Sequence, residues 1–194
     1  MRKTDGERQD EGKDVGAPVA KRLYESRTVL LFGEVDTKLA QNVTAQLLAL
    51  SAESDEPIRM IVHSQGGHVE AGDTIHDIVR FIRPEVKMIG TGWVASAGAL
   101  IFVSAKKENR VCLPNTRFLL HQPMGGVGGQ ASDIEIETRQ LLSMRERLNR
   151  IFARETGQTY ERIVQETERN FWMTASEAKE YGLVGRIVES VADV

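Results

Sequence analysis

The chain has 194 residues, of which 41% are apolar and 27% are charged, and its formal net charge is −3. This composition is typical of one globular domain with a substantial core, and the charge argues against nucleic acid as a partner. No apolar run reaches the roughly 18 residues of a membrane span, and the first residues carry no signal-peptide core. The single cysteine, Cys112, excludes an intrachain disulfide. We therefore expect a cytoplasmic protein without a membrane partner.

The N-terminal segment, residues 1–20, is polar and rich in charge and glycine. It can bury almost nothing, so we expect it to be flexible and to precede a single domain over residues 21–194. Ordered structure is expected to begin near Leu23.

Strand and helix signals then alternate along the first half of the domain. Strands are predicted at residues 28–32, 58–63 and 86–89, and helices at residues 37–52 and 69–82. Such alternation predicts an α/β fold with a parallel sheet and right-handed crossovers.

The stretch after the third strand places a serine at a chemically useful point. Gly90 and Gly92 loosen the backbone, and Ser96 then precedes an apolar segment long enough for a buried helix. Free N–H groups and the positive end of a helix dipole can stabilise an oxyanion at such a point. The alternative is that Ser96 only caps the helix. The stretch also lacks the Gly-x-Ser-x-Gly elbow of α/β-hydrolases, because position 94 is Val94.

Two more short strands are predicted at residues 110–113 and 117–121, and a glycine-rich stretch follows at residues 122–130. Six or seven residues of this kind form no stable element alone, but they can present an extended backbone to a ligand. His121 lies where the second of these strands ends, just before the glycines.

A long helix follows the glycine-rich stretch. Ser132 and Glu135 form a capping-box pattern, and the helix is expected to run from there to about Glu155, a length of about 36 Å. Its apolar residues form one narrow stripe, which is typical of a helix that projects from its domain and packs on a partner.

The C-terminal part predicts a short helix at residues 160–169 and an apolar cluster at residues 171–173. A second capping box, Thr174 with Glu177, opens another helix that Gly182 ends. A last strand is expected at residues 184–188.

The remaining histidines favour structural roles. His63 ends a predicted strand and fits a core histidine, and His76 lies beside Asp73 and Asp77 on a helix face. A metal site needs further convergent ligands, so a solvated face or an interface is favoured for His76. Cys112 is expected to be a small core residue. The pair at residues 66–67 is either a plain turn or part of a ligand crevice at the carboxyl end of a strand.

Several motifs together resemble the Clp protease family, the proteolytic subunits of ATP-dependent Clp proteases. In chain order they are Ser64-Gln-Gly-Gly67, Gly92-Trp-Val-Ala-Ser-Ala-Gly98, Leu113-Pro-Asn115, His121-Gln-Pro-Met-Gly-Gly126, Gln130-Ala-Ser-Asp-Ile-Glu135 and Thr174-Ala-Ser-Glu-Ala178. The resemblance runs from about residue 22 to residue 190. It implies a serine endopeptidase on a crotonase-like α/β fold.

The resemblance also implies roles for particular residues. Ser96 matches the nucleophile, His121 the general base, and Gly67 and Ala97 the two oxyanion N–H donors. The glycine loop matches the segment that pairs with the substrate backbone, namely Gly125, Gly126, Val127, Gly128 and Gly129. No metal and no cofactor are implied for the subunit itself.

The resemblance further implies an assembly of stacked heptameric rings, which an AAA+ unfoldase supplies with unfolded polypeptides. The long helix from Ser132 matches the handle that joins the two rings. The ring is expected to contain either copies of this chain alone or a related partner subunit as well.

Three features depart from the family pattern. Asn170 stands where the family has the aspartate of the triad, and it predicts a poor resting enzyme unless Glu166 or Glu168 supplies the charge. Trp93 replaces a smaller residue or glutamine close to the nucleophile, and the N-terminal segment is longer and more polar than the usual axial loop. The alternative functions are a weakly active or structural ring subunit and, less favoured, a crotonase-type acyl-CoA enzyme.

Overall fold

The structure is a computed structural model that describes residues 16–126 and 128–194. Its first element is helix α1 (Ala17–Glu25), which begins before Leu23, the expected start of order. No residue of α1 is buried. Flexibility was predicted for residues 1–20. Residues 1–15 lie outside the described part of the chain, whereas residues 17–20 are helical.

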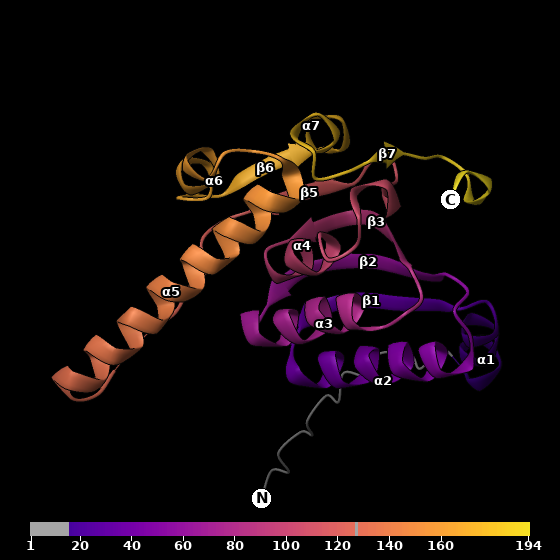
Figure 1. The fold of residues 1–194 in the computed structure, drawn as a ribbon, viewed down its shortest axis with the longest axis horizontal. Helices are drawn as coiled ribbons and strands as arrows, with labels where there is room; N and C mark the ends of the chain where they lie inside the picture. The colour runs from indigo at the N-terminus through magenta and orange to yellow at the C-terminus, as the bar shows by residue number, and fades with distance from the viewer. Residues whose placement is uncertain (1–15, 127) are drawn as a thin grey trace, which may run out of the picture.

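The core of the molecule is a sheet in which the described residues form seven strands (Figure 1). Five of them lie side by side in the order β1-β2-β3-β4-β7, and every neighbouring pair is parallel. These strands are β1 (Thr28–Val35), β2 (Ile58–Gly67), β3 (Val86–Ala95), β4 (Arg110–Cys112) and β7 (Arg186–Ile187). The predicted α/β fold with parallel pairing is confirmed.

The sheet branches at β3. The first half of β3 pairs with β4, whereas its second half pairs in parallel with β5 (Arg117–Leu120). A further strand, β6 (Phe171–Thr174), pairs antiparallel with β5. The apolar cluster expected at residues 171–173 is thus a strand, because its backbone pairs with that of β5. The carboxyl end of β3 therefore pairs with β5 and not with β4, and α4 follows it in the chain.

Two crossover helices, α2 (Thr37–Glu53) and α3 (Val69–Phe81), lie next to one another along the sheet (Figure 1). Their predicted apolar spacing is confirmed, since Val43, Leu47 and Ile75 are buried in the core. Helix α4 (Ala97–Phe102) is buried over its whole length. This confirms the buried helix expected after Ser96.

The C-terminal half begins with η1 (Lys107–Asn109) and continues through α5 (Ala131–Thr156), α6 (Tyr160–Glu166), α7 (Ala175–Tyr181) and η2 (Val191–Asp193). None of the helices in the described part of the chain combines the length and apolar character that crossing a bilayer requires. The capping box at Thr174 forms with Glu177, and Gly182 ends α7 in the left-handed region as predicted.

Helix α5 projects from the body of the molecule as predicted (Figure 1). Its 26 residues give it a length of about 39 Å. Only its C-terminal part packs on the core, through Leu148 and Phe152, while Ile136 and Leu142 are 53% and 57% exposed. The predicted capping box at its start is wrong, because Gln130 is the N-cap and no side chain caps this end. Several apolar side chains of the projecting part of α5 are therefore exposed in the single chain.

Of the two settings expected for His76, the solvated face is wrong. The side chain is not on a solvated face but is only 4% exposed, and its Nδ1 lies 2.9 Å from Asp77 Oδ1. Asp73 instead forms a bidentate ion pair with Arg147 of α5, at 2.6 and 2.7 Å. The described residues contain no group of histidine, cysteine and acidic side chains placed to hold a metal ion. Cys112 is a buried core residue, as predicted.

Candidate active site

Ser96 lies between β3 and α4 in a strained conformation. Its φ of 55° and ψ of −121° fall in a region that non-glycine residues rarely occupy and that costs on the order of 1–3 kcal/mol. Its N–H donates to Leu119 O at 2.9 Å, which ties the turn to β5. Although Ser96 occupies the N-cap position of α4, its side chain makes no capping hydrogen bond. The simple capping interpretation therefore does not explain this serine.

The end of β2 packs directly against Ser96. Gly66 has a φ of +95°, and a Cβ at this position would lie 2.6 Å from Ser96 Cβ and 2.9 Å from Ala95 O. Gly67 has a φ of +156°, and a Cβ there would lie 2.3 Å from Val35 O. Both residues belong to β2, so the plain turn considered for them is wrong. Gly66 is needed because the backbone of β2 approaches the serine turn, and Gly67 is needed because the same strand approaches Val35 of β1.

Strand pairing brings His121 next to Asn170. In the antiparallel pair of β5 with β6, Leu120 lies opposite Phe171. The next residue outward on each strand is His121 on one side and Asn170 on the other, and Asn170 lies close enough to act on the pKa of His121. Gln122 fixes the chain beyond this point, because its N–H donates to Thr167 O at 2.7 Å and its side chain to Glu168 O at 2.9 Å.

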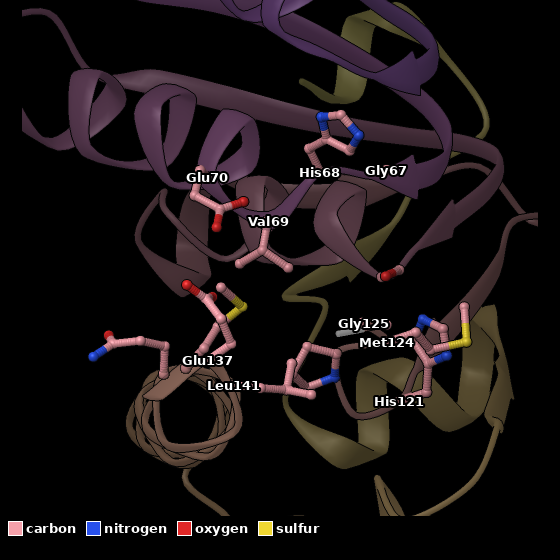
Figure 2. A pocket seen from close by; sticks show the side chains of 14 residues that line it. Gly67, His68, Val69, Glu70, His121, Met124, Gly125, Glu137 and Leu141 are labelled. Atoms are coloured by element: carbon pink, nitrogen blue, oxygen red, sulfur yellow. The ribbon is translucent and has the colours of Figure 1, made fainter. Parts of the chain in front are cut away.

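Ser96 and His121 line one pocket of about 310 Å³, which Figure 2 shows from close by. Gly67 lines its upper edge, and Gly125 and Gly126 of the glycine loop line the side next to His121. Helix α5 closes the opposite side. Among the described residues no hydrogen bond joins Ser96 Oγ to His121; catalytic contacts of this kind often tighten only around bound substrate.

The structure thus brings together Ser96, His121, Asn170, Gly67, Gly125 and Gly126. Ala97 is the first residue of α4, where N–H groups have no partner within the helix. Gly128 and Gly129 follow farther along the loop and are exposed, whereas Val127 lies outside the described residues.

Similarity to known proteins identifies the family of this chain. The family model described as Clp protease matches residues 11–191. The chain is 57% identical over 192 residues to the "ATP-dependent Clp protease proteolytic subunit 2" of Gluconobacter oxydans, covering 96% of this chain and 86% of that protein. It is equally identical, over 192 residues, to "proteolytic subunit 3" of Rhizobium etli, covering 98% and 99%. The chain belongs to the Clp protease family.

Solved structures of the family support the same assignment. The ClpP1 of Listeria monocytogenes matches with a TM-score of 0.82 at 51% identity, over 90% of this chain and 98% of that chain. An asparagine-to-aspartate mutant of the same protein gives a TM-score of 0.84 at the same identity and coverage. This Clp protease chain is a serine peptidase of the Clp type, and the crotonase-type acyl-CoA alternative is not favoured.

Burial sets the protonation of His121 in this Clp protease. Removal from water disfavours the imidazolium and lowers the pKa of His121 below its usual 6.5, while the hydrogen bond with Asn170 acts in the opposite direction. At neutral pH the imidazole is therefore mainly in the uncharged form that a general base requires.

The two glutamates suggested as substitutes for the triad aspartate have other partners in the structure. Glu166 accepts a hydrogen bond from the Tyr181 hydroxyl at 2.5 Å and pairs with Arg162 at 3.0 Å. The carboxylate of Glu168 pairs with Arg145 at 2.6 Å. Both carboxylates are thus paired with arginines, and Asn170 rather than either glutamate acts on the pKa of His121, which favours Asn170 as its partner.

Trp93 does not line the Ser96 pocket. Its ring stacks on Trp172 with centroids 6.2 Å apart and planes 7° apart, and Arg117 lies 4.3 Å above the Trp172 ring. Trp93, which departs from the family pattern, therefore lies on the surface formed by β3, β5 and β6 and not in the pocket beside Ser96.

Sequence reasoning missed the residues of α5 that face the pocket. They are Glu137, Gln140, Leu141 and Met144, and Val69 and Glu70 of α3 lie across from them. The positions on α5 follow the i, i+3, i+4, i+7 spacing of one helix face. That spacing was a usable signal, but it does not reveal what the face packs against.

Gly66 offers a first test of this packing. We expect Gly66→Ala to lower the free energy of unfolding by about 2 kcal/mol and to reduce peptidase activity strongly, because the new Cβ would collide with the Ser96 turn. Gly33→Ala is the matched control, since Gly33 also has a positive φ, +84°, but a Cβ there would meet no atom within 4 Å. Denaturant melts and peptide hydrolysis check both; equal losses in the two variants would contradict the close approach.

Proposed function

We propose that Ser96 is the nucleophile of this Clp-type peptidase and attacks the carbonyl carbon of the scissile peptide bond. The observation that carries the proposal is the strained serine turn, whose hydroxyl is not used as a cap and opens into the same pocket as His121. Strain of this kind is retained where the surrounding structure holds a side chain in position for function.

His121 is proposed to accept the Ser96 proton and to return it to the leaving amine. The carbonyl oxygen of Asn170 accepts the Nδ1–H of the imidazole and orients the ring. Because Asn170 carries no charge, it stabilises the imidazolium of the transition state less than a carboxylate would.

The backbone N–H groups of Gly67 and Ala97 are proposed to hold the oxyanion. Gly67 lines the pocket with Ser96, and Ala97 directly follows the nucleophile at the start of α4. The loop of Gly125, Gly126, Val127, Gly128 and Gly129 is proposed to pair with the substrate backbone. The exposure of its described glycines and the place of the first two at the pocket edge support this role.

We infer that the chain assembles into stacked heptameric rings through α5. The exposed apolar residues of its projecting half need a cover that the chain itself does not provide. The simpler assembly is a ring of identical copies. The alternative is a mixed ring, in which a related subunit compensates for low activity of this chain on its own.

Sedimentation tests the assembly. The protein at micromolar concentration is expected to sediment as seven or fourteen chains, and Leu142→Asp, which places a charge on the exposed face of α5, is expected to give smaller species. Val191→Asp is the control, since Val191 is exposed in η2, far from α5. A monomeric wild-type protein would refute this assembly.

The substrates are proposed to be unfolded polypeptides that a Clp ATPase of the AAA+ type delivers, with ATP used by that partner and no cofactor in this chain. The protein alone is expected to hydrolyse short peptides but to degrade a folded protein only when the ATPase and ATP are added. Degradation followed by gel electrophoresis checks this, with the non-hydrolysable ATP analogue as control. Equal degradation without ATP would contradict it.

Residues 1–20 are proposed to act at the axial entrance of the ring, in keeping with their polar composition. The cytoplasmic location expected from the sequence remains a prediction.

A further inference from the structure

The pocket beside Ser96 combines an apolar wall with two carboxylates. Val69 of α3 and Leu141 and Met144 of α5 supply the apolar wall. Glu70 and Glu137 line the same pocket, and no lysine or arginine is among the residues that line it. The charge at this site is therefore negative.

The two carboxylates come from different elements and converge on one space. Glu70 belongs to the first turn of α3 and Glu137 to α5. Figure 2 shows their side chains pointing toward one another across the pocket, with Val69 and Leu141 beside them. A group that enters this space meets both carboxylates.

Neither carboxylate forms an ion pair within the part of the chain that the structure describes. No ion pair joins Glu70 or Glu137 to a basic side chain there. The charge of Glu70 also acts on Arg147, but Arg147 is held by Asp73 through two hydrogen bonds of 2.6 and 2.7 Å. The pocket thus presents negative charge that the protein leaves for another molecule.

The chemistry of the lining residues matches that of a lysine or arginine side chain. Such a side chain packs an aliphatic stem against apolar surface while its cationic head reaches a polar site several ångströms away. Here the stem would lie along Val69, Leu141 and Met144, and the head would reach Glu70 and Glu137. Hydrogen bonds between ionised partners are about twice as strong as neutral ones, and water is partly displaced from a pocket once it is filled.

We propose that this pocket selects a lysine or arginine at the residue whose carbonyl Ser96 attacks. The proposal rests on the function proposed above, because it takes Ser96 as the nucleophile, and it adds the substrate class. A pocket that opens beside the nucleophile receives the side chain of that residue. An uncharged aliphatic side chain leaves the two carboxylates without a cation, and an acidic one is repelled.

Three fluorogenic peptides that differ only at this residue test the proposal with the full-length protein. They carry lysine, norleucine, which keeps the four-carbon stem without the ammonium group, or glutamate. We expect kcat/KM to be about tenfold higher for lysine than for norleucine and lowest for glutamate. The lysine preference should shrink at high salt, since screening weakens the charge term.

Variants locate the source of the preference. Glu70→Gln and Glu137→Gln should each reduce the lysine-to-norleucine ratio several-fold, and the double variant should bring it close to one. Glu137→Lys should raise kcat/KM for the glutamate peptide above that of the parent, a gain that damaged folding cannot produce. Glu161→Gln is the matched control, because Glu161 is an exposed acidic residue of α6 outside the pocket.

The outcomes separate this proposal from the one on which it rests. Equal or faster hydrolysis of the norleucine peptide, in an enzyme that is blocked by Ser96→Ala, would overturn the basic specificity and leave the nucleophile intact. An unchanged ratio in both glutamine variants would likewise overturn it. Hydrolysis that survives Ser96→Ala would instead overturn the proposed function.

Discussion

Replacement of Ser96 by alanine is expected to abolish hydrolysis of short fluorogenic peptides. If Ser96 forms the acyl-enzyme, no other group in the pocket can take over the covalent step. Loss of the nucleophile in well-studied serine proteases costs about 10⁶ in kcat, and a loss of that order would leave no measurable turnover here.

The same variant is expected to fold normally. The Ser96 hydroxyl makes no capping hydrogen bond, and alanine keeps the Cβ that the turn already accommodates. The melting temperature and the sedimentation profile should therefore match those of the parent protein.

Ser176→Ala is the control for this experiment, since Ser176 lies exposed on α7 and does not line the pocket. It should hydrolyse peptides at the rate of the parent. Activity retained in the Ser96 variant, with assembly unchanged, would show that Ser96 is a structural residue and that the proposed mechanism is incorrect.

Replacement of Asn170 by aspartate is expected to raise kcat/KM. The asparagine oxygen can orient the imidazole, but it carries no charge to stabilise the imidazolium that forms in the transition state. In serine proteases with a Ser-His-Asp triad, the reverse change from aspartate to asparagine costs about 10⁴ in kcat. We expect a smaller gain here, of about tenfold or more, because the residues around position 170 are adapted to an amide and not to a carboxylate.

The pH profile should shift in a defined direction in the same variant. Burial holds the pKa of His121 below 6.5, so the acid limb of kcat/KM in the parent should lie below that value. A carboxylate beside the ring favours the imidazolium and raises the pKa of His121. Since the base must be uncharged, the acid limb of Asn170→Asp should move to higher pH, and the gain should be largest above neutrality.

Asn115→Asp provides the control, because Asn115 lies in the exposed turn between β4 and β5 and changes net charge equally. It should alter neither the rate nor the pH profile. An Asn170→Asp variant with unchanged or lower kcat/KM in an intact assembly would show that residue 170 does not limit catalysis.

The sequence predicted best the elements whose residues carry a strong period. Val43 and Leu47 mark the buried face of α2, and Thr174 with Glu177 forms the capping box that opens α7. The projection of α5 could also be predicted, because a helix with only one narrow apolar stripe cannot be buried over its whole length. In each case the deciding information lies within a few residues of the element.

The errors arose where distant segments decide the outcome. Gly66 and Gly67 look like a turn, but pairing with Glu34 and Val35 of β1 makes them the end of a strand. Residues 171–173 look like an isolated apolar cluster until β5 is placed beside them. His76 has acidic neighbours in sequence, yet the packing of α3 buries it.

The residues of the candidate site likewise fall into those that the sequence could predict and those that it could not. Ser96 and His121 stand out at the ends of predicted strands, and the family pattern ties them to Asn170. The facing of Glu70 and Glu137 could not be predicted, because it depends on where α5 leaves the body of the molecule. A sequence pattern can identify a helix face without identifying the surface opposite to it.

Active-site labelling tests the central claim most directly. The intact assembly is treated with a fluorophosphonate probe, digested, and mapped by mass spectrometry, alongside His121→Ala as the variant without the general base. We predict a single adduct on Ser96 that forms much more slowly in the His121 variant. An adduct on a different serine, or labelling of Ser96 at the same rate without His121, would contradict an activated Ser96–His121 pair.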